Sequence, residues 1–198
     1  MILEVVTNCV SLRPIPNQSK STLMKLTLRL RVFITIIVTL LVCSHLAWDY
    51  FHGGIPTHYL LHNKDLPGIP NWWGGIVLPF FTWFLLYRIH KRIDTPGSEE
   101  LLKSVISRFL AAVLVSVIIA VCFMNSIDVI DYIMGSLFVL AFFFSLYKAE
   151  YLLGWVLGSA FTFGAIIPIG FGSLFALVFF LFYKIPRAIV NYFRSKKA

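Results

Sequence analysis

Charged side chains are scarce in this sequence, and carboxylates are the scarcest of them. Only 13% of the 198 residues are charged, with nine Asp and Glu against 17 Lys and Arg. A soluble domain usually has about 25% charged residues, so the composition argues against a soluble globular protein. Mean hydropathy is +0.84, and long apolar runs alternate with short polar joints. This pattern is typical of a multi-pass protein of the cell membrane, which is the inner membrane in a bacterium.

Cysteine is also rare, and recognised catalytic motifs are lacking. The three cysteines, Cys9, Cys43 and Cys122, do not have the spacing of a metal site, and an odd number does not make a disulfide framework. No H-E-x-x-H pattern occurs. The later apolar runs carry almost no ionisable group at mid-depth, which argues against an ion channel or pump, because crossing ions usually need such groups.

The apolar runs predict an all-α fold, a membrane bundle of about six transmembrane helices. We expect a single domain over 24–189, a poorly ordered N-terminal tail over 1–23, an extracytoplasmic insert at 52–71 and a basic C-terminal tail over 190–198. The Pro and Gly of "IIPIGFG", residues 166–172, divide the last long apolar stretch into two short spans. The six spans cover about 31–51, 72–89, 105–123, the run from the turn "NSID" to 147, and two parts of 151–183.

The basic residues indicate the orientation of these spans. They lie at the ends of apolar runs and form no surface stripe, so the net charge of +8 does not indicate nucleic-acid binding. With both termini in the cytoplasm, every Lys and Arg except Lys64 lies on the cytoplasmic side. That distribution obeys the positive-inside rule and favours six spans over five.

The insert and the end of the first span gather polar side chains that the rest of the chain lacks. Four of the five histidines lie there: His45, His52, His58 and His62. His45, Asp49 and His52 follow i, i+4, i+7 spacing, which places them on one stripe of a helix. Gly53, Gly54 and Pro56 are expected to end that helix. Thr57 is a plausible N-cap of a short interfacial helix carrying His58 and His62.

Other groups are expected at the same extracytoplasmic rim. Asp128 and Asp131, at the start of the fourth span, lie on one helix face and are possible supporting residues. Trp72 and Trp73 are expected to anchor the second span at the membrane interface. Imidazole and carboxylate together suit a divalent metal such as zinc, and the same groups could instead relay protons.

Three classes of function fit these observations. The first is a metal-dependent membrane enzyme that acts on a lipid-like substrate at the outer leaflet. The second is a small transporter or substrate-binding component, with the 52–71 insert covering an outward-facing pocket for a lipid-like or apolar ligand. The third is a non-catalytic assembly subunit. In each case the lipid bilayer is the main partner and no nucleic acid is expected.

Overall fold

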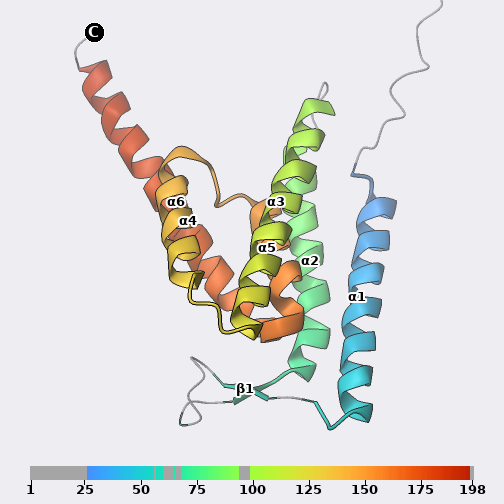
Figure 1. The fold of residues 1–198 in the computed structure, drawn as a ribbon. Coiled ribbons are helices and arrows are strands. Elements are labelled where there is room, and N and C mark those ends of the chain that lie inside the picture. Colours follow the sequence, from blue (N-terminus) through green and yellow to red (C-terminus); the bar gives the residue numbers. More distant parts are fainter. Residues whose placement is uncertain (1–25, 56, 60–64, 66–67, 94–98, 197–198) are drawn as a thin grey trace, which may run out of the picture.

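The computed structural model describes residues 26–55, 57–59, 65, 68–93 and 99–196. Within these residues the chain forms six helices and one two-stranded hairpin (Figure 1). The expected N-terminal tail lies outside the described residues. The elements are α1 (Leu28–Phe51), β1 (Thr57–Tyr59), β2 (Gly68–Pro70), α2 (Trp72–Ile93), α3 (Glu99–Met124), α4 (Ile130–Phe143), α5 (Ala149–Phe163) and α6 (Ile166–Ser195).

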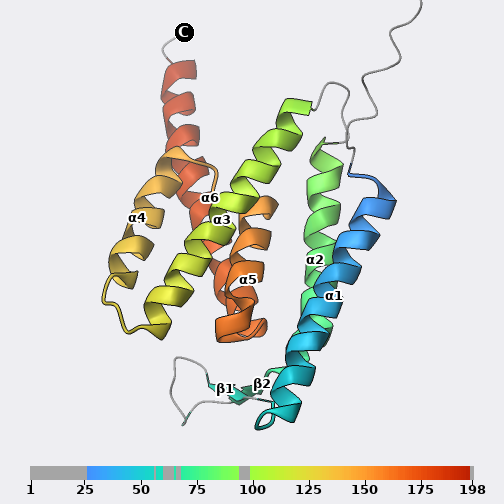
Figure 2. The ribbon, with the colours of Figure 1, turned by 45° about the vertical axis from the view of Figure 1, so that its right-hand side comes forward.

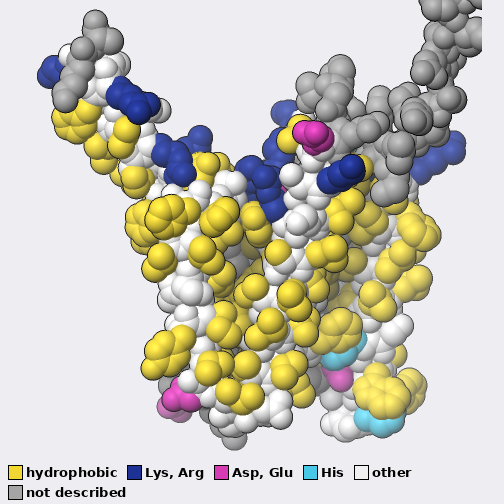
Figure 3. Space-filling view, turned by 45° about the horizontal axis from the view of Figure 1, so that its top comes forward, with side chains coloured by type: hydrophobic (Ala, Val, Ile, Leu, Met, Phe, Trp, Pro, Cys, Tyr) yellow, Lys and Arg dark blue, Asp and Glu magenta, His cyan; other side chains and the backbone are white. Residues whose placement is uncertain are grey.

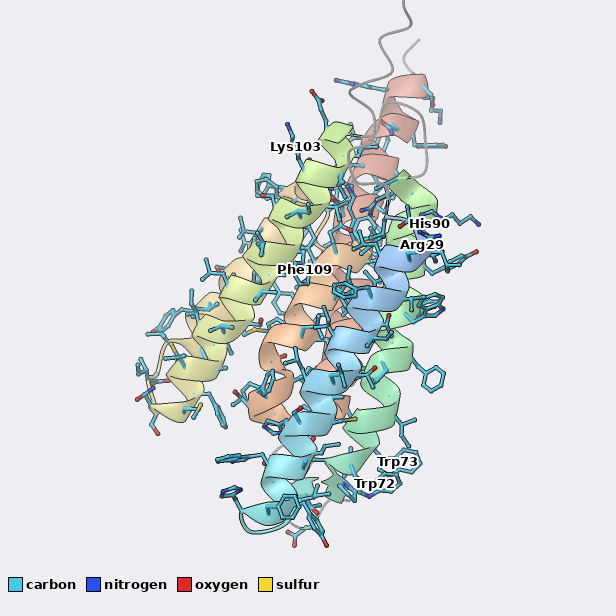
Figure 4. All side chains as sticks on the ribbon, turned by 90° about the vertical axis from the view of Figure 1, so that its right-hand side faces the viewer. Arg29, Trp72, Trp73, His90, Lys103 and Phe109 are labelled. Atoms are coloured by element: carbon cyan, nitrogen blue, oxygen red, sulfur yellow. The ribbon has the colours of Figure 1, made fainter. Side chains whose placement is uncertain are left out.

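The helices alternate in direction along the bundle, and the two ends of the bundle differ in their side chains. The start of α1 and the end of α6 lie at one end, and the hairpin lies at the other (Figures 1 and 2). Lys and Arg side chains gather mainly at the first end, and hydrophobic side chains cover the middle (Figure 3). We call these the basic end and the hairpin end. Arg29, His90 and Lys103 mark the basic end in Figure 4, and Trp72 and Trp73 mark the hairpin end.

Three of the described helices, α1, α3 and α6, are long and apolar enough to cross a membrane. The apolar run of α2 is diluted by Trp, Gly, Pro and Thr. With 15 residues, α5 is about 22 Å long, and α4 with 14 residues is slightly shorter. Both are shorter than the roughly 30 Å hydrocarbon core of a bilayer. The composition and these helices suggest an integral membrane protein.

The short helix α5 lies at the centre of the fold, packed against α2, α3 and α6. It approaches α3 closely because two glycines, Gly154 and Gly158, face that helix. A Cβ at Gly154 would lie 2.5 Å from the Phe109 carbonyl oxygen, and one at Gly158 would meet Ser116. Small residues four apart permit such close approach of membrane helices.

A buried carboxylate fixes the first turn of α5. The side chain of Glu150 is fully buried. Its Oε2 accepts a hydrogen bond of 2.7 Å from Arg92 Nη2 on α2, and its Oε1 accepts one of 3.2 Å from Arg108 Nη1 on α3. Three helices therefore meet at one ionic cluster near the basic end.

Two further arginines attach the outer helices. Arg31 of α1 is buried, with its guanidinium 5.2 Å from the ring centre of Trp83 on α2. Arg187 of α6 donates hydrogen bonds to the carbonyl oxygens of Phe142 and Phe143, at 3.0 and 3.3 Å. It thereby satisfies carbonyls that the end of α4 leaves without an intrahelical partner.

Several sequence-based expectations about helix ends are confirmed, and others are wrong. α1 does end at Phe51, and the φ angles of Gly53 and Gly54, +126° and +96°, are those that favour glycine. The prediction of an interfacial helix after Thr57 is wrong, because Thr57–Tyr59 is a strand that pairs antiparallel with Gly68–Pro70. The last apolar stretch is divided as expected, but at Gly164 with φ +70°, before the proposed turn at 166–172. Its second part is not a short span, because α6 continues to Ser195.

Replacing Gly154 by alanine should destabilise the bundle. The added methyl meets the Phe109 backbone, which cannot move without shifting α3, so we expect Gly154→Ala to lower the free energy of unfolding by about 1–3 kcal/mol. Gly135→Ala is the matched control, since a Cβ added at that position would have no atom within 4 Å. That change should be neutral or stabilise by up to about 1 kcal/mol through helix propensity. Thermal unfolding in detergent measures both, and equal midpoints would contradict the close α3–α5 packing.

Candidate functional site

Two residues of the histidine-rich stripe form a pair at the hairpin end of α1. Asp49 Oδ2 lies 3.3 Å from His45 Nδ1, and the two side chains are 17% and 27% exposed. The distance is that of an ion pair, but Asp49 Oδ2 has no aligned hydrogen bond from any described residue. The carboxylate therefore retains capacity for a further donor or a cation. The i, i+4 spacing does bring these two side chains together.

His52, the third member of the stripe, does not join the pair. It follows the last residue of α1, where the chain leaves the helix toward Gly53. Its Nδ1 lies 2.9 Å from the Trp48 carbonyl oxygen, and its ring stacks on the Trp48 indole at 3.8 Å. The i+7 position on the stripe therefore does not bring His52 to the pair, and this residue is exposed.

His45 lines a small pocket between α1, α2 and α5, which we call the rim pocket. Its volume is about 110 Å³. The imidazole packs edge-on against Phe161, with ring centres 5.1 Å apart. Asn71 adds an amide to a wall that is otherwise apolar. The pocket is thus a small apolar space with an imidazole and an amide on its wall.

The other predicted rim residues are not brought to this pair. Asp128 and Asp131 are exposed near the start of α4, on the opposite side of the bundle from α1 in both ribbon views (Figures 1 and 2). The backbone of His58 lies in β1, and His62 falls outside the described residues. Among the described residues, no group of three His, Cys, Asp or Glu could hold a metal ion. Zinc binding through His58 or His62 stays a prediction.

Trp72 and Trp73 begin α2 at the hairpin end, where Figure 4 labels them. Their rings stack with centres 4.6 Å apart, and each residue is 44% exposed. An exposed indole pair at one end of an apolar bundle has the placement that interface anchors require.

A larger cavity, which the sequence did not indicate, lies between α3, α4, α5 and α6. We call it the interhelical cavity, and its volume is about 280 Å³. Aliphatic and aromatic side chains and one glycine make up its wall. It is lined by Ala111, Ala112, Val115, Met134, Leu137, Leu140, Phe144, Leu146, Tyr151, Leu152, Trp155, Gly172, Phe175, Ala176 and Phe179.

One polar atom on this wall lacks a partner. Trp155 Nε1 is buried and receives no hydrogen-bond acceptor from the described part of the chain. The Trp155 indole packs against Gly172. A Cβ at position 172 would lie only 2.8 Å from Trp155 Cδ1, so the absence of a side chain at Gly172 makes room for the indole. A buried N–H without an acceptor costs free energy.

The cationic cluster of the basic end adjoins the interhelical cavity. Tyr151 and Leu146 on the cavity wall are close in sequence to Glu150 and Lys148. Arg108 lies one helical turn from Ala111 and Ala112 on α3. The pKa of Lys148 is lowered, first by burial and then by the charges of Arg108 and Arg92, while Glu150 opposes the shift.

Comparisons of the chain with protein families, with curated proteins and with solved structures found no match in any of the three.

The different placements of His45 and His52 make the zinc hypothesis testable. If the rim binds zinc, His45→Ala should remove it and Asp49→Asn should weaken it by about 10–100-fold, as losing the carboxylate beside a ligating histidine does. His52→Ala is the matched control and should retain zinc, because its ring faces away from the pair. Elemental analysis of the purified proteins measures this. A wild-type protein without stoichiometric metal would contradict the zinc hypothesis, and zinc loss in His52→Ala would contradict the geometry.

Proposed function

We propose that this chain is a multi-pass integral membrane protein that binds a lipid-like or apolar ligand in the interhelical cavity. The observation that carries the proposal is a space of about 280 Å³ with an almost entirely apolar wall. Protein interiors are close-packed, with few voids larger than a water molecule. An apolar cavity of about 150 Å³ is large enough to stay dry and bind benzene. A space of this size and composition suits a hydrocarbon chain.

The walls of the cavity support this use. α4 touches α6 and only lightly α3, so it forms an outer wall that is not closely packed on α5. Phe175 and Phe179 of α6 and Trp155 of α5 are bulky aromatic residues of the inner wall. A long apolar molecule would match this wall. Among the three classes of function, this favours the ligand-binding component.

We also propose that all six helices cross the membrane of the cell, with the basic end in the cytoplasm. The concentration of Lys and Arg at that end supports this orientation. The short helices α4 and α5 can be accommodated because they pack against longer neighbours and the bilayer can thin locally.

A second candidate function is chemistry at the rim pocket. The His45–Asp49 pair supports it, because a carboxylate beside an imidazole orients the ring for proton transfer or metal binding. On this hypothesis the protein is an enzyme that acts on a lipid-like substrate at the hairpin end.

Filling the interhelical cavity should prevent ligand binding. Ala176 lines the cavity from α6, and Ala176→Phe adds a ring to it. The matched control is Leu177→Phe, because Leu177 is 57% exposed on the same helix and is not part of the wall. We expect Ala176→Phe to lower binding of a fluorescent single-chain fatty acid at least about tenfold, since the bound chain would lose several buried methylenes at about 0.8 kcal/mol each.

Binding is measured by fluorescence titration in detergent, with unfolding midpoints recorded for each variant. Equal affinity in wild type and Ala176→Phe, with both proteins folded, would contradict a ligand site in this cavity. Equal loss in Leu177→Phe would show that binding is to the outer surface.

The proposed orientation predicts where reporters will be found. A reporter fused to the C-terminus should be cytoplasmic, and one inserted between residues 63 and 70 should be extracytoplasmic, because the two positions belong to opposite ends of the bundle. Paired phosphatase and fluorescent-protein fusions in cells measure this. Two reporters on the same side would contradict the six-span topology.

A further inference from the structure

The cluster at the basic end carries more positive charge than its own carboxylate neutralises. Arg92, Arg108 and Lys148 are close enough for the two arginines to lower the pKa of the lysine. Among the described residues, Glu150 is the only carboxylate that contributes to that field, and both of its oxygens are already bonded to the arginines. Within the described residues, the cations of the cluster therefore outnumber its carboxylates.

The surplus charge is accessible. The side chains of Arg92 and Arg108 are 35% and 29% exposed, although Glu150 is fully buried between them. Lys148 is half-buried in the connection between α4 and α5. An anion could therefore reach the cations without breaking the ion pairs that hold α2, α3 and α5 together.

Lys148 and Arg108 lie within one helical turn of cavity-wall residues along the chain. Leu146 and Tyr151 belong to the cavity wall, and Lys148 lies between them in the sequence. The hydroxyl of Tyr151 is within reach of the Arg108 guanidinium. A molecule with a hydrocarbon chain in the cavity would thus place its polar end beside Lys148 and Arg108.

Resting on the proposed function, we propose that the ligand is an anionic phospholipid of the membrane leaflet at the basic end. Its acyl chain occupies the interhelical cavity and its phosphate binds Lys148 and Arg108. Lys and Arg donate charge-assisted hydrogen bonds to phosphate oxygens, which are stronger than neutral ones. The chain contributes apolar burial that a free phosphate ion lacks, so the lipid is favoured over inorganic phosphate.

Head-group preference tests the proposal. Wild-type protein in detergent is offered phosphatidylglycerol and phosphatidylcholine with identical chains, and bound lipid is counted by native mass spectrometry. We expect phosphatidylglycerol to be preferred, and Lys148→Gln to reduce that preference roughly fivefold by removing one charge-assisted contact. Arg194→Gln is the matched control, because it removes the same charge from an exposed position near the end of α6. Arg108→Lys keeps the charge beside Glu150 and should retain most of the preference.

The outcomes separate this inference from the proposed function. Ala176→Phe should reduce binding of both lipids; if it reduces neither, the cavity site itself is wrong. If it reduces both while Lys148→Gln leaves the head-group preference unchanged, the cavity binds chains but the cationic cluster does not select the head group. An equal effect of Arg194→Gln would mean that general surface charge causes the preference. Displacement of the lipid by millimolar inorganic phosphate would show that the cluster recognises free phosphate, and would overturn the lipid as its occupant.

Discussion

The buried ion cluster of Glu150 with Arg92 and Arg108 is the contact on which the rest of the bundle depends. A carboxylate removed from water costs several kcal/mol unless cations and hydrogen bonds compensate, and here two arginines do so. Glu150 also lies in the first turn of α5, where the helix dipole favours a negative charge. Because the two arginines come from α2 and α3, this one side chain fixes where α5 begins relative to both helices.

That position has consequences along the length of α5. With Glu150 held at the basic end, Gly154 and Gly158 face α3 one and two turns further on, and the two helices come into close contact. The other side of α5 carries Trp155, which packs toward the aromatic residues of α6. Small residues on one face and an indole on the other make the packing asymmetric. The helix α4 is held to α6 through Arg187 and not drawn onto α5, so the interhelical cavity is a consequence of this asymmetry.

The sequence was sufficient for the helices and for some of their contacts. Apolar runs and their polar joints predicted the six apolar helices of the described chain, and Gly53 and Gly54 predicted the end of α1. The i, i+4 spacing of His45 and Asp49 placed them together correctly, because local helix geometry alone determines it. His52 failed the same argument because the helix ends at the preceding residue, so helical periodicity no longer sets the direction of its side chain.

Tertiary contacts were beyond such reasoning. The strand pairing of Thr57–Tyr59 with Gly68–Pro70 depends on a partner about ten residues away, and the local N-cap pattern at Thr57 pointed to a helix instead. The two arginines that bind Glu150 are 42 and 58 residues distant in sequence, so no local pattern indicates the ionic cluster. The cavity depends on how side chains of four helices fill space, and the sequence of one segment does not determine that.

The two ends of the bundle differ in how their charges are balanced. At the hairpin end, the Asp49 carboxylate lies beside the His45 imidazole, its ion-pair partner among the described residues. In the cluster at the basic end, three described cations share one described carboxylate whose oxygens are both bonded to arginines, and burial further penalises the charge of Lys148. Adding a second carboxylate to the chain would relieve this imbalance, but it would also remove any reason for an external anion to bind. The ion pairs of this cluster link three helices, but among the described residues its cations outnumber its carboxylates. Such a cluster beside an apolar cavity has the chemistry that an anionic amphiphile requires.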